Sequence, residues 1–172
     1  MPESTAQVLR VLMPSPIGPL GLELHGTALT RLIIEPSETD RPAFTPLNLF
    51  DGSDSLDEVF GRLAEYFAGA RRKLDIEFDL TVSGAAAFVR RVLRETAKIP
   101  YGKTRTYQEI AEASGRPDCR HDVAATLREN PIPIVIPCHR VVAEDGGLGD
   151  YVGGSSRKRW LLELESQAAE LL

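Results

Sequence analysis

The chain has 172 residues, of which 42% are hydrophobic and 26% charged, and its formal net charge is −5. This length fits one or two small domains, and this balance is typical of a globular protein. The net negative charge argues against a protein that holds nucleic acid by charge alone, although a local basic face is compatible with DNA binding. We find no apolar run of membrane-spanning length and no signal peptide, so we expect a cytoplasmic protein that does not enter membranes.

The first half of the chain predicts short strands around one helix. Leu20, Leu22 and Leu24 alternate with small or charged residues, as in a half-buried strand, and His25-Gly26 predicts a hairpin turn after it. Residues 36–54 are rich in Pro, Asp, Ser and Thr and should form a loop. The other expected elements are strands over 7–13, 28–35 and 74–80, and a helix capped by Ser55 whose apolar residues are Leu56, Val59, Phe60, Leu63 and Phe67.

The second half predicts mainly helices. After a linker over 81–84, apolar residues at helical spacing predict a helix over 84–97. A last helix should begin at Ser155 or Ser156, and its carboxylate Glu165 is either a solvated flank or a buried, partnered group. The apolar stripe expected on this last helix is Leu161, Leu164, Ala168 and Leu171.

Between these helices lies a candidate helix-turn-helix. Thr106–Glu109 has the spacing of a capping box, which predicts a helix that ends near Ser114 and stops at Gly115. A second helix over 119–129 must end before Pro131. Any two short helices with a tight turn give this pattern, so the pattern alone leaves the motif open.

The stretch 132–142 concentrates the chemistry of the chain. Mainly β-branched apolar residues run directly into Pro137-Cys138-His139-Arg140, so a buried segment should stop at a cavity there. A free cysteine is most often a buried structural thiol. A neighbouring base lowers the pKa of a thiol and favours the nucleophilic thiolate, which is the competing interpretation of Cys138. The chain's other cysteine, Cys119, allows at most one disulfide, and no Cys–His spacing fits zinc, so we expect no metal site.

Pro137-Cys138-His139-Arg140-Val141 resembles the active-site motif of the O6-alkylguanine-DNA alkyltransferases. Further segments are similar to this family at its spacing, without a gap, from about Ile99 to Glu165. These segments are Ile99–Thr104, Tyr107–Ala111, Asn130-Pro131, Tyr151 with Gly153-Gly154, Lys158, and Leu161–Glu165, and near the start of the chain Ser15–Leu20.

The resemblance implies a fold and a reaction. The fold would be of the α/β (α+β) class, with a small ribonuclease-H-like supporting domain over 1–80. A mostly helical domain over 85–172 would follow, with a helix-turn-helix at about 107–130. The protein would flip an O6-alkylguanine out of double-stranded DNA and transfer the alkyl group to Cys138, irreversibly and once per molecule, without a cofactor.

The resemblance also implies residue roles around Cys138. His139 would be the base, Glu165 the carboxylate that orients it, and Asn130 a supporting hinge. The groups that contact the nucleotide would be Tyr107, the carbonyls of Cys138 and Val141, the amide near Val152, Tyr151 as pocket wall, and Lys158 beside the pocket.

DNA would be bound by the second helix of the motif. The implied DNA-contacting residues are Thr106, Arg120, His121, Ala124, Ala125 and Arg128, the small ones allowing close approach to the minor groove. Where the family has an arginine that fills the gap left by the flipped base, this chain has His121, followed by Asp122. A shorter, uncharged side chain and a carboxylate near phosphates predict weaker DNA binding or slower flipping. We expect a monomer, with cooperative binding along DNA left open.

Two other functions fit parts of the pattern. A non-catalytic lesion-binding module would resemble this family but would lack the cysteine. A helix-turn-helix regulator would dimerise over a two-fold site, and no dimerisation heptad is visible. Neither alternative uses the set formed by Cys138, His139 and Glu165.

Overall fold

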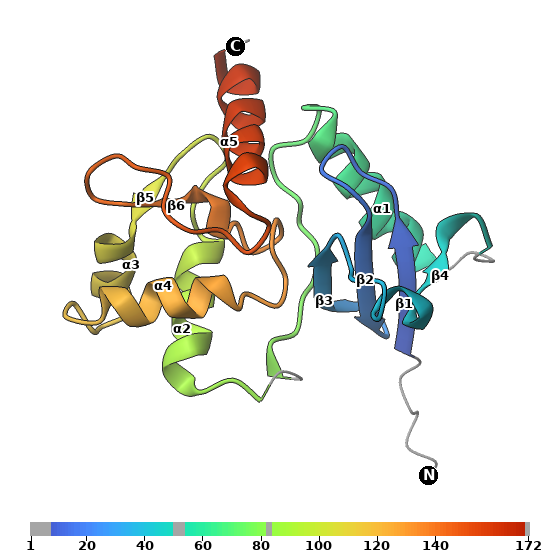
Figure 1. The fold of residues 1–172 in the computed structure, drawn as a ribbon, viewed down its shortest axis with the longest axis horizontal. Coiled ribbons are helices and arrows are strands. Elements are labelled where there is room, and N and C mark those ends of the chain that lie inside the picture. Colours follow the sequence, from blue (N-terminus) through green and yellow to red (C-terminus); the bar gives the residue numbers. More distant parts are fainter. Residues whose placement is uncertain (1–7, 50–53, 82–83, 171–172) are drawn as a thin grey trace. The chain divides into compact units, whose positions relative to one another are not determined.

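The computed structural model describes residues 8–49, 54–81 and 84–170. The chain divides into two compact units, Met1–Val82 (unit 1) and Ser83–Leu172 (unit 2). Figure 1 shows a sheet with one long helix in unit 1 and a mainly helical unit 2.

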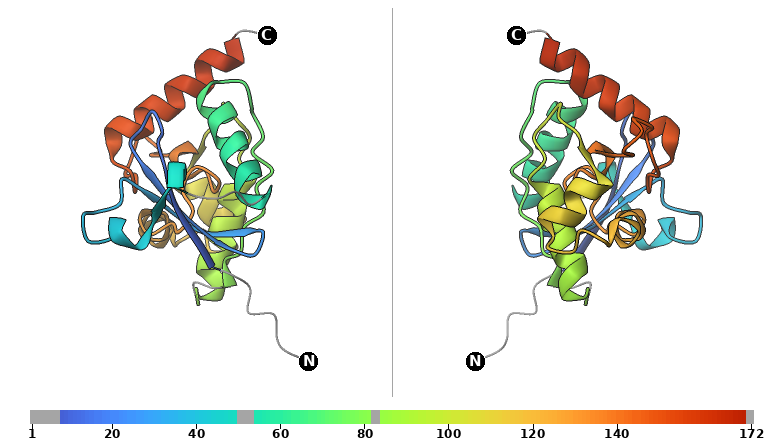
Figure 2. Two further views of the ribbon diagram at one scale, coloured as in Figure 1. Left: turned by 90° about the vertical axis from the view of Figure 1, so that its right-hand side faces the viewer. Right: turned by 90° about the vertical axis from the view of Figure 1, so that its left-hand side faces the viewer.

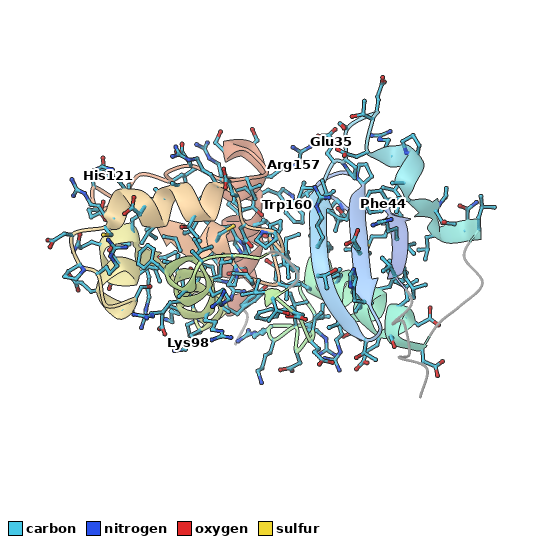
Figure 3. The ribbon with its side chains drawn as sticks, turned by 90° about the horizontal axis from the view of Figure 1, so that it is seen from below. Glu35, Phe44, Lys98, His121, Arg157 and Trp160 are labelled. Carbon is cyan, nitrogen blue, oxygen red and sulfur yellow. The ribbon has the colours of Figure 1, made fainter. Side chains whose placement is uncertain are left out.

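Unit 1 is built on a four-stranded sheet of order β3-β2-β1-β4. Strands β1 (Val8–Met13), β2 (Leu20–His25) and β3 (Ala28–Ile34) are antiparallel neighbours, as the alternating leucines and the His25-Gly26 turn predict. The leucines of β2 are fully buried. Phe44 packs on the sheet over Gly21 of β2 (Figure 3). A side chain at this position would be too close, because a Cβ would lie 3.0 Å from the ring of Phe44.

Helix α1 (Asp54–Phe67) lies against this sheet (Figures 1 and 2). All five apolar residues predicted for it are buried, which confirms the helical spacing. The expected loop over 36–54 also contains the 3-10 turns η1 (Arg41–Ala43) and η2 (Leu47–Leu49) and the short strand β4 (Thr45–Pro46), which pairs in parallel with β1. The sequence did not predict β4, and residues 50–53 of this loop lie outside the described residues.

The predicted strand over 74–80 is wrong. Only one isolated bridge, between Leu29 and Phe78, joins this segment to the sheet. Asp75 takes a positive φ of 50°, and Arg62 of α1 donates to the carbonyls of Leu74 and Asp75, so the start of the segment cannot join a ladder. Its alternating side chains Ile76 and Leu80 are nevertheless buried.

Unit 2 packs three helices together, α2 (Ala87–Ala97), α3 (Tyr107–Ala113) and α4 (Arg120–Arg128). The capping box is confirmed, since the Thr106 hydroxyl accepts from the Glu109 amide and the Glu109 carboxylate accepts from the Thr106 amide. Gly115, with a φ of 77°, ends helix α3. Helices α3 and α4 are the helix-turn-helix, and with the sheet of unit 1 they confirm the α+β class.

The start of helix α2 differs from prediction. Helix α2 begins three residues late, because Gly84 has a φ of 63° and Ala86 is extended. The linker predicted over 81–84 includes residues 82–83, which lie outside the described residues.

The buried face of the last helix, α5 (Ser155–Glu170), was predicted wrongly. Leu161 is buried, but its buried neighbours on the helix are Lys158 and Glu165, while Leu164 is only half-buried. The expected stripe residue Leu171 lies outside the described residues. Ala168 is also half-buried, so the predicted stripe is confirmed only at Leu161, and two charged groups with polar partners complete the buried face.

Two short paired strands bring the start of α3 close to the segment that contains Cys138. Strand β5 (Arg105–Thr106) pairs in parallel with β6 (Val141–Val142), which directly follows the 3-10 turn η4 (Cys138–Arg140). This pairing brings Tyr107, the first residue of α3, to the level of Cys138–Arg140.

None of the helices in the part of the chain that the structure describes combines the length and apolar character needed to cross a membrane. Within 8–49, 54–81 and 84–170, no three His, Cys, Asp or Glu side chains gather as a metal site would require.

Candidate active site

Cys138 follows a buried and locally strained segment. Ile132, Ile134 and Ile136 are buried as predicted, and Ile134 has a φ of 75°, which is unusual for a β-branched residue. Asn130 holds the segment from both ends, because its side chain accepts from the Ile132 amide at 3.0 Å and donates to the Ile136 carbonyl at 2.9 Å. This clamp fixes the backbone that presents Cys138.

The thiol of Cys138 is protonated in the resting protein. Burial raises the pKa of Cys138 to about 11, and hydrogen bonding from Asn130 and the charge of Lys158 only partly oppose this. The sequence-based expectation of a lowered thiol pKa is therefore wrong, because removal from water outweighs the neighbouring groups. A proton must leave during any reaction of Cys138.

His139 is held by Glu165 in the interior. Both side chains are almost completely buried, and His139 Nε2 lies 2.8 Å from Glu165 Oε1. With Nε2–H donated to the carboxylate, the neutral ring carries its lone pair on Nδ1. Of the two interpretations of Glu165, the buried and partnered one is confirmed.

Arg140 completes this network, and sequence reasoning gave it no role. Its Nη2 and Nε donate to the two oxygens of Glu165 at 2.9 and 3.0 Å, and its Nη1 donates to the Ile99 carbonyl at 2.6 Å. The amide of Gly102 donates to Glu165 at 3.0 Å. Each charge thus has partners, as burial requires. The signal in the sequence was the basic residue next to the Cys-His pair, but its partners lie far away in the chain.

The network sets the protonation of both partners. Burial would raise the pKa of Glu165, but hydrogen bonds from His139 and Arg140 lower it to about 2. Burial lowers the pKa of His139 below its ordinary value, against the opposing effect of Glu165. His139 is therefore neutral at pH 7, next to an ionised carboxylate.

Lys158 and Tyr107 lie on the side of the site formed by the loop before α5. The Nζ of Lys158 donates to the carbonyls of Val141 at 2.6 Å and Asp150 at 3.1 Å, and lies 5.9 Å from the centre of the Tyr107 ring. Burial lowers the pKa of Lys158 to about 8. Burial raises the pKa of Tyr107, whose hydroxyl donates to the Asp150 carbonyl at 3.3 Å.

Tyr151 carries a buried hydroxyl for which the described residues offer no hydrogen-bond partner. Its ring packs edge-on against His139, with 6.2 Å between the ring centres. Burial raises the pKa of Tyr151 well above its ordinary value. A buried polar group without a protein partner often marks a binding site. The next residue, Val152, is exposed.

Most of the residues predicted to contact DNA lie on one face of α4. His121, Ala124, Ala125 and Arg128 have the spacing of one helix face, and His121 projects from the outer end of the helix (Figure 3). Ala125 also lines, with Asp122, a groove of about 640 Å³ between α4 and α2. Arg120 is exposed, and the hydroxyl of Thr106 already serves as helix cap.

Known proteins share this chain's sequence and fold. The DNA-binding domain of 6-O-methylguanine DNA methyltransferases matches residues 87–167. The methylated-DNA–protein-cysteine methyltransferase of Mycobacterium tuberculosis is 42% identical over 157 residues, 90% of each chain. That of Mycobacterium leprae is 42% identical over 155 residues, 89% of each. The chain belongs to the methylated-DNA–protein-cysteine methyltransferase family. A crystal structure of Mycobacterium tuberculosis OGT in complex with DNA superposes with a TM-score of 0.81, at 40% identity over 94% of each chain.

Family membership confirms the predictions of a DNA-repair protein and a methyltransferase. The region matched by the family model also contains the candidate site, namely the thiol of Cys138 and the network around Glu165. All predicted catalytic and nucleotide-contacting residues lie in unit 2, and all except Val152 are buried or half-buried.

Proposed function

We propose that this methyltransferase transfers the alkyl group of O6-alkylguanine in double-stranded DNA to Cys138, irreversibly and once per molecule. One observation carries the proposal: a buried thiol directly precedes a neutral histidine that is locked by an ionised carboxylate. This is the order of nucleophile, base and orienting group that covalent catalysis requires.

The reaction exchanges one bond for another. The thiol proton of Cys138 passes to Nδ1 of His139, and Glu165 stabilises the imidazolium that forms. The sulfur attacks the alkyl carbon, an S–C bond forms, and the C–O6 bond breaks with its electron pair on guanine. Guanine regains a proton, so the thiol proton ends on the leaving base. The thioether has no ready leaving group, hence one turnover.

The substrate side of the site would be formed by the loop before α5. Tyr107, as a neutral phenol, would donate to N3 of the leaving guanine, and Lys158 would stabilise the negative charge that develops. The carbonyl of Val141 and the amide of Val152 would read the guanine edge. The hydroxyl of Tyr151 would gain its partner from the bound nucleotide.

DNA would approach through α4. Helix α4 would lie in the minor groove, with Thr106, Arg120, His121, Ala124, Ala125 and Arg128 as the contacting residues, and the nucleotide would be flipped out to reach Cys138. Unit 1 (predicted as a supporting domain over 1–80) would take no part in the chemistry. The protein would act as a monomer in the cytoplasm, where it reaches DNA.

His121 would make flipping slower than an arginine would. His121→Arg is therefore expected to raise single-turnover transfer from a methylated duplex, without the same gain on free O6-benzylguanine, which needs no flipping. Equal duplex rates of the variant and the parent would contradict this role.

The test of the function is transfer of radioactive methyl from an O6-methylguanine duplex to the protein. Label should bind at one methyl per molecule, disappear in Cys138→Ser, and persist in Cys119→Ser, which removes the chain's other cysteine. Duplex binding without label transfer would instead favour a lesion-binding module.

A further inference from the structure

Asp150 contacts both α4 and the residues around Cys138. Its carboxylate forms an ion pair with Arg128 of α4, with 3.2 Å between Arg128 Nη1 and Asp150 Oδ2. Its backbone carbonyl accepts from both Tyr107 and Lys158. One residue therefore contacts a predicted DNA-binding group through its side chain and two nucleotide-facing groups through its backbone.

The backbone contacts hold Asp150 in place. Gly149, just before it, has a φ of 69°, and a Cβ at this position would lie 2.5 Å from the Tyr107 hydroxyl oxygen. Tyr107 and the Gly149–Asp150 backbone are thus in close contact. Lys158 is fully buried, so its hydrogen bond to the Asp150 carbonyl fixes the Gly149–Asp150 backbone to the interior of unit 2. The carboxylate of Asp150 is consequently pre-placed beside Arg128.

The ion pair itself lies in solvent. The side chains of Arg128 and Asp150 are 56% and 66% exposed. Exposed pairs of this kind contribute little to stability and are easily exchanged. A DNA phosphate can bond a guanidinium through two oxygens at once, whereas the Arg128–Asp150 pair has a single contact at 3.2 Å. Arg128 is therefore held by a weak anion that DNA can replace.

We propose that the carboxylate of Asp150 is a built-in competitor for DNA at Arg128, so that docking of a duplex exchanges the Arg128–Asp150 pair for an Arg128–phosphate pair. Asp150 is in this sense a positioning residue that lowers DNA affinity and orients Arg128 before contact. The inference rests on the proposed function in one respect, namely that α4 is the DNA-contacting helix.

The exchange predicts a specific effect of removing the charge. Asp150→Asn keeps the backbone carbonyl and the side-chain size but leaves Arg128 without its anion. Affinity for an unmodified duplex at low salt should rise about threefold to tenfold. The slope of log K against log salt should steepen by up to about 0.9, because in the parent the carboxylate that docking releases takes up a cation and so offsets the counterion released at one phosphate. Fluorescence anisotropy over a series of KCl concentrations measures both.

Three further variants make this a test of the pair. Asp150→Glu keeps a carboxylate and should restore the parent's slope. Asp145→Asn removes one charge from the same loop, where Asp145 bonds only the Gly147 amide among the hydrogen bonds found, and should leave the slope unchanged. Arg128→Gln should weaken binding more in the Asp150→Asn background than in the parent, because in the parent the gain from the Arg128–phosphate contact is partly offset by the loss of the Arg128–Asp150 pair.

The inference is overturned if Asp150→Asn has the parent's affinity and slope, or if Asp145→Asn changes both as much as Asp150→Asn does. Methyl transfer by the parent is measured in parallel, and it tests the proposed reaction at Cys138 separately from the role of Asp150. A parent that transfers methyl while Asp150→Asn binds as the parent does refutes only the role of Asp150. A parent that transfers no methyl, but whose salt slope depends on Asp150, refutes only the proposed reaction.

Discussion

Unit 1 and unit 2 fill their interiors with different side chains. Within 8–49 and 54–81, Thr30 is the only buried side chain of the polar or charged residue types, and aliphatic and aromatic side chains make up the rest of the core. Unit 2 buries His139, Arg140, Lys158 and Glu165. Burying charged groups costs free energy even when they are paired, so packing alone would favour apolar residues there. The difference indicates that unit 1 is optimised for stability and that unit 2 gives up stability for chemistry.

The strongest way to test this contrast is to break the charge network. Glu165→Gln leaves Arg140 buried opposite a neutral group, so the free energy of unfolding should fall by about 3–5 kcal/mol. Methyl transfer should fall as well, because His139 loses the charge that stabilises its imidazolium. Urea unfolding and single-turnover kinetics measure the two effects. Glu163→Gln, an exposed change on the same helix, is the control, and an equally small effect of Glu165→Gln would contradict the account.

A cavity in unit 1 should affect stability only. Leu63 of α1 is fully buried, so Leu63→Ala should lower the free energy of unfolding by about 2–5 kcal/mol. The folded variant should still react with free O6-benzylguanine at the parent's rate, at a temperature well below its unfolding transition. Ala64→Ser, at the exposed neighbouring position, should be close to neutral. A large loss of rate in folded Leu63→Ala would assign unit 1 a part in the chemistry.

The pH dependence should report the buried groups of unit 2. His139 must be neutral to accept the thiol proton, and its pKa is lowered by burial. The transfer rate should therefore be flat near neutrality, begin to fall only below pH 6.5, and then drop about tenfold per pH unit. Stopped-flow rates with free O6-benzylguanine measure this. A rate already falling between pH 8 and pH 7 would contradict a neutral resting His139.

The free energy of unfolding should change with pH below pH 4.5 and above pH 9. The pKa of Glu165 is about 2 against an ordinary 4.5, so its contribution is complete above pH 4.5 and is lost as pH falls toward 2. The pKa of Cys138 is raised from 9 to about 11, so its contribution is complete below pH 9 and is lost as pH rises toward 11. Cys138→Ser should remove the alkaline loss, and this comparison isolates the thiol.

The smallest expected effect concerns the helix cap of α3. Thr106→Ala removes the acceptor for the Glu109 amide and should cost about 1 kcal/mol. Thr104→Ala, two residues earlier and outside the capping box, should cost less. Urea unfolding of both variants checks the difference. Equal costs would mean that the cap is not what stabilises the start of α3.

Local patterns predicted those parts of the molecule that neighbours in the sequence determine. The capping box, the α1 spacing and the helix stop at Pro131 depend on residues a few positions apart, and all three are found. The strand over 74–80 failed because a distant side chain, Arg62, takes the carbonyls of that segment. Strand β4 was missed because Thr45–Pro46 joins β1 only through long-range pairing.

The candidate site shows the same limit. The family motif identified Cys138, His139 and Glu165 as a set, but the roles of Arg140 and Asp150 depend on partners far away in the chain. The apolar stripe predicted for α5 failed because hydrophobic spacing cannot reveal that Lys158 and Glu165 find partners in the interior. The raised pKa of Cys138 likewise comes from burial, which the adjacent histidine does not announce.

The most direct test of the account is the mass of the intact protein after incubation with an O6-methylguanine duplex, followed by peptide mapping. We predict a gain of one methylene on every active molecule, mapped to the peptide that contains Cys138, and no gain in Cys138→Ser. A gain that maps to Cys119, or no gain with either the duplex or free O6-benzylguanine, would contradict the role of Cys138 as the alkyl acceptor.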